Sequence, residues 1–259
     1  MTFPINLHFG DLEISSHLIF ELLSFTLGYQ YYAFLKRKNT DLISDENRFW
    51  IFIGAVSGAW LGSHLLGILE NPDYFAKTNY LNRVKPQAPF FVYLLGNKTV
   101  VGGLLGGLIG VEVTKKIIGV TTSSGDLMTF PLILGLIIGR IGCFLAGVHD
   151  GTFGVATNVP WAMDLGDGVL RHPTNLYEIV FLLLLWLFII LLEKRIILAN
   201  GYRFKVFMVS YLLFRLSVEF IKPAYFFSFG LSSIQLACLA GILYYCVLAI
   251  KSWRYPFFT

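Results

Sequence analysis

Seven long apolar segments dominate this sequence and restrict it to one class of fold. Each is close to the roughly 20 residues that a helix needs to cross the hydrocarbon core of a bilayer. A backbone in lipid must satisfy its own hydrogen bonds, so such segments are expected to be helical. We therefore predict an all-α polytopic membrane protein with seven transmembrane helices, forming a single transmembrane domain over residues 1–259. The expected spans are 17–35, 49–69, 99–118, 127–147, 175–192, 204–221 and 231–250.

Composition supports the same class. Of the 259 residues, 56% are hydrophobic and 14% are charged, whereas soluble domains are about 25% charged. The net charge is only +4, and the basic residues are spread over the loops, so no nucleic-acid partner is expected. The three cysteines, Cys143, Cys238 and Cys246, lie in apolar segments and lack the spacing of a disulfide framework or a zinc motif.

The basic residues also predict an orientation. The first span ends in Lys36, Arg37 and Lys38, which places that end in the cytoplasm because positive charge is enriched there. Alternation of the spans then puts the N-terminus outside and the C-terminus in the cytoplasm. Two long extra-cytoplasmic loops result, at about 70–98 and 148–173. Loops of this length often form lids or binding segments.

One arginine lies inside an apolar span. Arg140 belongs to the fourth span, and a guanidinium group in hydrocarbon is costly enough that it usually marks a functional site. No opposite charge lies within one helical turn of it. We expect its partner to be an anionic ligand or a carboxylate from another helix, the alternative being a side chain that snorkels to the interface.

Other ionisable residues are predicted at the same outer depth. Arg215 and Glu219 are four residues apart on one helix face, where they could simply neutralise each other. Glu178 could lie in interfacial water. His17 and His64 are interpreted as packing or interface residues. His149 and Asp150 lie in the loop and are expected to be solvated, with a role in catalysis as the alternative.

Paired glycines mark the third span. Glycines four residues apart line one helix face and let another backbone approach closely. A backbone surface that holds a phosphate group is the alternative interpretation. The glycines are Gly102, Gly103, Gly106, Gly107 and Gly110.

Several motifs together resemble one family, the prolipoprotein diacylglyceryl transferases. Residues 139–147, Gly-Arg-Ile-Gly-Cys-Phe-Leu-Ala-Gly, with Gly151, resemble its signature. Residues 171–178, Arg-His-Pro-Thr-Asn-Leu-Tyr-Glu, resemble its Arg-His-Pro-Ser-Gln-Leu-Tyr-Glu. The order of motifs over residues 99–241 also matches: Gly102-Gly103-Leu104, Asp126, the Arg215 to Glu219 segment, and Gly-Leu-Ser-Ser-Ile-Gln at 230–235.

The resemblance implies an activity and its partners. The family moves the diacylglyceryl group of phosphatidylglycerol onto the thiol of a lipobox cysteine in a prolipoprotein signal peptide, and glycerol phosphate leaves. The implied location is the bacterial inner (plasma) membrane, with membrane lipids around a multi-pass enzyme. No cofactor and no metal are implied.

The resemblance also implies site residues. Arg140 and Arg215 would bind the phosphate, because arginine offers planar bidentate donors, and Glu219 and Glu178 would orient them. A histidine with a pKa near neutrality suits the general base, and His172 and His149 are the candidates. The expected substrate-binding residues are Gly102, Gly103, Cys143, Gly151, Tyr177 and Asp126.

Three positions depart from the family pattern. Much of the family has asparagine at Cys143, glutamate at Val148 and histidine at Val101. These changes indicate a divergent branch, so a lipid-binding or altered-substrate relative without prolipoprotein transferase activity is the alternative function. A transporter ranks lower because its polar sites would lie near the midplane. A retinal-type receptor would need a lysine in 231–250, where none occurs.

Overall fold

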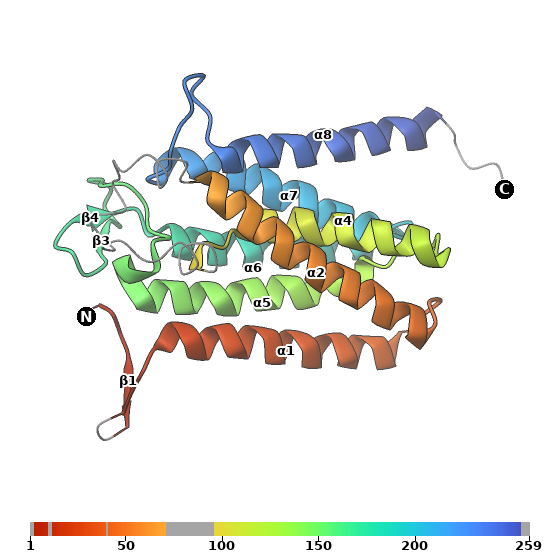
Figure 1. Ribbon diagram of the computed structural model, residues 1–259, viewed down its shortest axis with the longest axis horizontal. Helices are drawn as coiled ribbons and strands as arrows, with labels where there is room; N and C mark the ends of the chain where they lie inside the picture. The colour runs from red at the N-terminus through yellow and green to blue at the C-terminus, as the bar shows by residue number, and fades with distance from the viewer. Residues whose placement is uncertain (1–2, 10–11, 40, 71–95, 255–259) are drawn as a thin grey trace. The chain divides into compact units, whose positions relative to one another are not determined.

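The computed structural model describes residues 3–9, 12–39, 41–70 and 96–254. These residues fold into seven α-helices with short 3-10 helices and strands (Figure 1). They divide into two compact units that interleave along the chain. The first unit comprises Met1–Asp41 and Ser123–Pro223, and the second comprises Leu42–Thr122 and Ala224–Thr259. The predicted loop at 70–98 lies almost entirely outside the described residues.

Four long helices form the body of the first unit, and α5 contacts each of the other three. The helices are α1 (Ser16–Lys38), α5 (Asp126–Ala146), α6 (Thr174–Arg195) and α7 (Tyr202–Val218). Two 3-10 helices extend α5 and α7, η3 (Gly147–Asp150) and η4 (Glu219–Ile221). Residues that follow one another along α5 can therefore face α1, α6 or α7.

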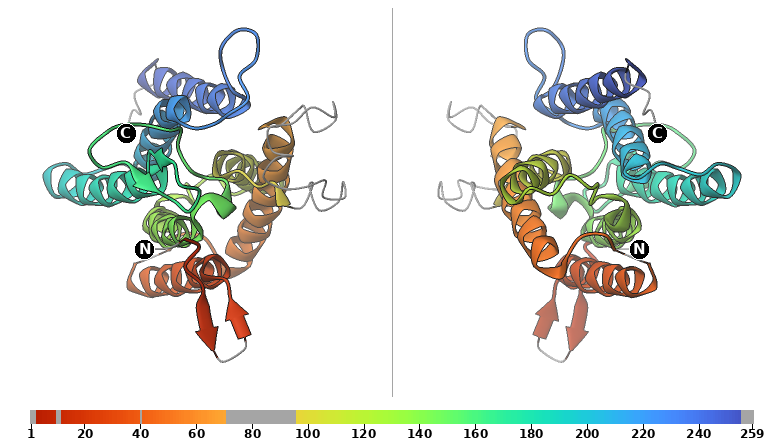
Figure 2. Two further views of the ribbon diagram at one scale, coloured as in Figure 1. Left: turned by 90° about the vertical axis from the view of Figure 1, so that its left-hand side faces the viewer. Right: turned by 90° about the vertical axis from the view of Figure 1, so that its right-hand side faces the viewer.

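Two small antiparallel hairpins complete the first unit. The strands β1 (Leu7–Phe9) and β2 (Leu12–Ile14) precede α1, and they project sideways from the N-terminal end of that helix (Figure 2). This hairpin was not predicted from the sequence. The predicted loop at 148–173 contains η3 and the strands β3 (Met163–Asp164) and β4 (Leu170–Arg171).

The two faces of α6 explain why it needs a lipid environment. Its inner face buries Glu178, Leu182, Leu185 and Ile189, which recur at helical spacing. Its opposite face is also apolar but exposed, and a helix that is apolar all round suits a membrane. Within the described part of the chain, four helices are long and apolar enough to cross a membrane: those over Asp45–Glu70, Asp126–Asp150, Thr174–Arg195 and Ser233–Ile250.

In the second unit, α2 (Asp45–Glu70) packs closely against α4 (Val100–Ile118), and α8 (Ser233–Arg254) contacts both. A Cβ atom at Gly58 would overlap the carbonyl oxygen of Gly106, and one at Gly62 would overlap that of Gly102. The tight helix packing predicted from the glycine spacing is confirmed. Thr99 is the N-cap of α4, and its Oγ1 accepts a hydrogen bond of 3.2 Å from the Gly102 amide.

We predict that Gly106→Ala destabilises the protein by about 1–3 kcal/mol, the usual cost of overpacking. The added methyl group would meet the Gly58 backbone, which cannot rotate away. Gly103→Ala is the matched control, because its Cβ would lie 3.8 Å from Ala59 and Ser63 and alanine is the better helix former. Denaturant unfolding in detergent micelles measures both; equal stability of the two variants would contradict the prediction.

Candidate functional site

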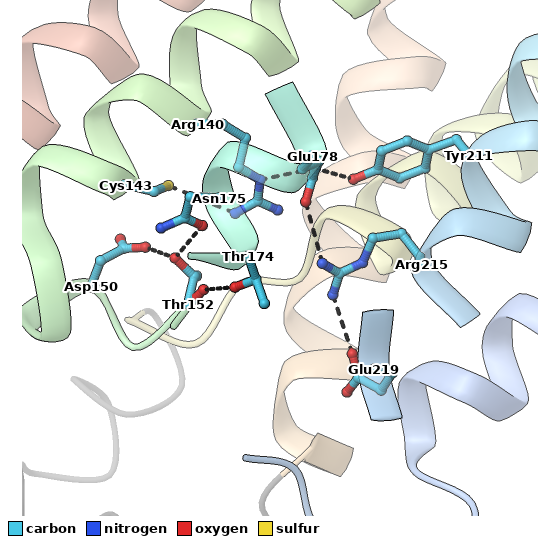
Figure 3. Close-up of polar contacts among 10 residues, drawn as sticks. All are labelled: Arg140, Cys143, Asp150, Thr152, Thr174, Asn175, Glu178, Tyr211, Arg215 and Glu219. Atoms are coloured by element: carbon cyan, nitrogen blue, oxygen red, sulfur yellow. Dashed lines mark hydrogen bonds and ion pairs between the residues drawn. The ribbon is translucent and has the colours of Figure 1, made fainter. Parts of the chain in front are cut away.

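One buried carboxylate joins three helices of the first unit. Glu178, in the second turn of α6, is 2% exposed. Its Oε1 lies 2.9 Å from Arg140 Nε on α5, and its Oε2 lies 3.3 Å from Arg215 Nη1 on α7 (Figure 3). The partner of Arg140 is thus a carboxylate from another helix. The two arginines expected to meet do so, on opposite oxygens of one side chain.

Two further residues complete this group. The Tyr211 hydroxyl donates a hydrogen bond of 2.7 Å to Glu178 Oε1, and Arg215 Nη2 lies 3.3 Å from Glu219 Oε2. All five side chains are buried. Burial of an isolated charge is prohibitive, but here two guanidinium groups balance two carboxylates. We call Arg140, Glu178, Tyr211, Arg215 and Glu219 the arginine cluster.

The arginine cluster retains hydrogen-bond donors that could serve a ligand. Arg215 Nε is buried and has no hydrogen-bond partner among the described residues. Among the described residues, the hydrogen-bond acceptor of Arg140 Nη1 is weak, Cys143 Sγ at 3.7 Å. Because guanidinium groups match phosphate oxygens in geometry and charge, the cluster can bind an anionic headgroup.

A second polar group forms where the loop meets α6. His172 Nδ1 lies 3.0 Å from the Tyr177 hydroxyl, which also accepts a hydrogen bond of 2.7 Å from Trp161 Nε1. Arg171 pairs with Asp167 and lies over the Phe153 ring. The structure therefore brings His172 and Tyr177 together, in contacts separate from those of the arginine cluster.

The Arg171 side chain shifts the pKa of its partner. Its hydrogen bonds to Asp167 hold the pKa of that carboxyl below its usual value. A depressed pKa in the folded state means that the pair contributes stability above the ordinary carboxyl pKa. That contribution is lost as the pH falls through the folded-state pKa, and it is small because both side chains are partly exposed.

Several other predicted site residues lie apart from the arginine cluster. Asp126 is fourteen residues from Arg140 along α5, about 21 Å at the helical rise. There it accepts hydrogen bonds from the backbone amides of Gly201 and Phe204, at 2.5 and 3.0 Å, and so caps α7. His149 and Gly151, the latter with φ of +74°, are exposed. Gly102 and Gly103 belong to α4 of the second unit.

The prediction for Asp150 was wrong. It was expected to be solvated, yet its side chain is only 10% exposed, and its Oδ1 lies 3.0 Å from His17 Nε2. Its Oδ2 accepts a hydrogen bond from the Thr152 hydroxyl. His17, expected to be a packing or interface residue, thus joins a polar cluster with Asp150. Of the residues described, His17, Cys143 and Asp150 are those that could together hold a metal ion.

Tyr211, His17 and Thr152 were not predicted as site residues, and for Asp150 a catalytic role was the alternative interpretation. A signal existed for Tyr211, which precedes Arg215 by four residues and therefore shares its helix face. None existed for the contact between His17 and Asp150, because it depends on how α1 packs against α5.

Comparison with known proteins gives one consistent result. A family model described as prolipoprotein diacylglyceryl transferase matches residues 4–251. Relatives named phosphatidylglycerol–prolipoprotein diacylglyceryl transferase include one from Bordetella bronchiseptica, 32% identical over 85% of this chain and 82% of the relative. The one from Trichormus variabilis is 28% identical over 97% and 87%. The one from Leifsonia xyli is 28% identical over 79% and 65%.

Glu178→Gln should destabilise the fold by about 3–5 kcal/mol, because it leaves two buried guanidinium groups without their shared counter-charge. Tyr211→Phe should cost about 1.5–3 kcal/mol, the worth of a hydrogen bond to a charged group. The control is Glu193→Gln, which breaks the partly exposed pair with Arg203 and should cost less than about 1 kcal/mol. Unfolding in detergent micelles ranks the variants, and a Glu178 variant as stable as the control would refute this account.

Proposed function

The chain belongs to the prolipoprotein diacylglyceryl transferase family, and on that premise we propose that it transfers the diacylglyceryl group of phosphatidylglycerol to a cysteine thiol of a prolipoprotein. The observation that carries the proposal is the meeting of Arg140 and Arg215 on Glu178. Two guanidinium groups held by one carboxylate are already oriented before a phosphodiester arrives. Such preorganised charge stabilises a leaving group that gains negative charge.

The chemistry also requires a base, which takes the proton of the acceptor thiol. The sulfur then attacks the terminal glycerol carbon of the lipid and forms a carbon–sulfur bond. The carbon–oxygen bond to phosphate breaks, and its electron pair stays on the phosphate oxygen. Glycerol phosphate leaves with more negative charge than the diester carried, and the buried Arg215 Nε offers a free donor for one of its oxygens.

An apolar groove beside the polar residues supports a lipid donor. It lies on α6 and α7. Two aromatic rings that line it, those of Phe181 and Phe214, are stacked with their centroids 4.3 Å apart. A hydrocarbon chain in this groove would place its headgroup toward the α6 end that carries Glu178. The lining residues are Leu176, Tyr177, Val180, Phe181, Leu184 and Phe214.

A second candidate function, lipid binding without transfer, is favoured by the loss of polar side chains at two positions. Val148 and Val101 stand where the family pattern has glutamate and histidine. A lipid-binding relative without transferase activity would keep the arginine cluster and lose those groups. In a purified system, phosphatidylglycerol binding without transfer to any thiol peptide would support this second function.

We further propose that seven helices span the bacterial inner membrane, with the N-terminus outside and the C-terminus in the cytoplasm. The proposal adds α1, α4 and α7 to the four helices that could cross a membrane by length and composition. Of these, α1 ends in Lys36, Arg37 and Lys38, and α4 ends in Lys115 and Lys116. Basic helix ends favour the cytoplasmic side, which places the arginine cluster in the outer half of the bundle.

Reporter fusions test the orientation. Alkaline phosphatase inserted after Asp167, in the β3–β4 hairpin, should be active because that hairpin would lie outside. A green fluorescent protein fused to the C-terminus should fluoresce, as it does only in the cytoplasm. The reverse pattern at both positions would refute the proposed orientation.

Transfer itself is tested with purified protein, labelled phosphatidylglycerol and a lipobox peptide. Arg140→Gln should lower the rate by about 10²–10³-fold, the usual effect of losing one donor to a developing charge. Arg140→Lys should recover only part of it, because lysine lacks the planar fork. Arg203→Gln, a partly exposed arginine of the same unit, is the control and should leave the rate unchanged. A fully active and folded Arg140→Gln enzyme would refute the role of this cluster.

A further inference from the structure

Three potential metal ligands converge next to the arginine cluster. They come from three elements: His17 from α1, Cys143 from α5 and Asp150 from η3. One ligand atom of each lies within 4.8 Å of the other two. Imidazole, thiolate and carboxylate are the three donor types that bind Zn²⁺. The cluster is therefore more than an ion pair between His17 and Asp150.

We propose that His17, Cys143 and Asp150 bind one Zn²⁺ ion, which takes the acceptor thiol as its fourth ligand. The proposal rests on the proposed transferase function for the identity of that fourth ligand only. Zinc sites that act in catalysis use three protein ligands and keep one position for water or substrate. A coordinated thiol is deprotonated outright, and the thiolate is the nucleophilic form of cysteine.

The distances suit zinc coordination. Zinc binds nitrogen at about 2.0–2.1 Å and carboxylate oxygen at about 2.0–2.2 Å, so two such ligands of a tetrahedron lie about 3.3 Å apart. His17 Nε2 and Asp150 Oδ1 lie 3.0 Å apart. Cys143 Sγ lies within 4.8 Å of both of these atoms. A small movement of the sulfur toward them would place the three ligand atoms at three corners of a tetrahedron around the ion.

The carboxylate ligand is oriented by a second layer of contacts. The Thr152 hydroxyl contacts Asp150 Oδ2 and lies 3.0 Å from Asn175 Oδ1. Thr174 Oγ1 donates a hydrogen bond of 2.9 Å to the Thr152 carbonyl group, which fixes that residue to the start of α6 (Figure 3). Such outer contacts hold metal ligands in place and tune them. They leave Asp150 Oδ1 directed at His17.

A close helix crossing holds the histidine near the thiol. Gly142 precedes Cys143, and a Cβ atom at Gly142 would lie 2.7 Å from Phe20 Cβ and 3.4 Å from His17 Cα. Only a residue without a side chain lets α1 approach α5 this closely. The glycine next to the cysteine thus brings the ligand from α1 within reach.

Charge and exposure also favour a divalent cation. The Cys143 thiolate and the Asp150 carboxylate would together neutralise Zn²⁺, while Arg140 keeps Glu178 as its own partner. The His17 side chain is 36% exposed, which leaves an approach for the ion and for an acceptor thiol. Arg140 Nη1 is 3.7 Å from Cys143 Sγ, so the metal would lie beside the phosphate-binding group.

The reaction step balances without any redox change. A hydroxide on the zinc takes the proton of the acceptor thiol and leaves as water, and the thiolate takes its place. The bound sulfur then attacks the terminal glycerol carbon, while the carbon–oxygen bond to phosphate breaks toward oxygen. The thioether product is a poor ligand and would leave the metal. Water would return to the fourth position and give up one proton to the released glycerol phosphate, which restores the hydroxide.

Metal content is the first test. The full-length protein, purified in detergent and incubated with ZnCl₂, should retain about one zinc ion per chain after gel filtration, as expected for a single site. Cys143→Ala and Asp150→Asn should lose at least about tenfold in affinity, as disrupted zinc sites do. The matched controls Cys238→Ala, a buried cysteine of the second unit, and His149→Ala, an exposed neighbour of Asp150, should keep the ion.

Cobalt substitution tests the ligands directly. Co²⁺ in the site should give a sulfur-to-cobalt charge-transfer band that Cys143→Ala abolishes and Cys238→Ala keeps. A lipobox peptide should intensify this band by adding a second sulfur, and a peptide with serine in place of the cysteine should not. No retained zinc and no charge-transfer band in folded wild-type protein would overturn the proposal.

The metal site and the transferase function can fail separately. Bound zinc without transfer to any thiol peptide would refute the transferase function and leave the metal site standing. Transfer that survives complete removal of zinc by a chelator would refute the catalytic zinc and leave the transferase function standing. Thermal unfolding of each variant shows that lost zinc reflects lost ligands rather than a lost fold.

Discussion

The polar centre of the first unit depends on one buried carboxylate. Glu178 contacts Arg140, Arg215 and Tyr211 at the same time, so α5, α6 and α7 meet on a single side chain. Without Glu178, Arg140 would lose its paired carboxylate and Arg215 would keep only Glu219, and desolvation of an unpaired charge is costly. The same carboxylate that permits burial also fixes the direction in which both arginines present their remaining donors.

The helix α5 links this cluster to the second one. Arg140 and Cys143 are three residues apart on α5, and their side chains touch through Nη1 and Sγ at 3.7 Å. One faces the carboxylate of α6, and the other faces His17 of α1 and Asp150 of η3. On the functions proposed above, the phosphate of the donor and the thiol of the acceptor would meet across one helical turn.

The departures from the family pattern gain a physical meaning in this arrangement. On the resemblance to the family pattern, Cys143 stands where much of the family has an amide, and its thiol, which can carry negative charge, has a histidine and a carboxylate within reach. The same resemblance implies glutamate at Val148 and histidine at Val101. The polar partners of Cys143 thus lie on the side of α5 that contacts α1.

The sequence alone determined the helices and the identity of the costly residues. Long apolar segments can only be helices in lipid, and the observed helices fall on the predicted spans; Arg140, Arg215, Glu178 and Glu219 stood out because charge is rare in such segments. Only the tertiary structure decided which of them meet. It buried Asp150 against His17 and set the Asp126 carboxylate against the start of α7. Contacts between helices depend on their packing and rotation, which hydropathy does not specify.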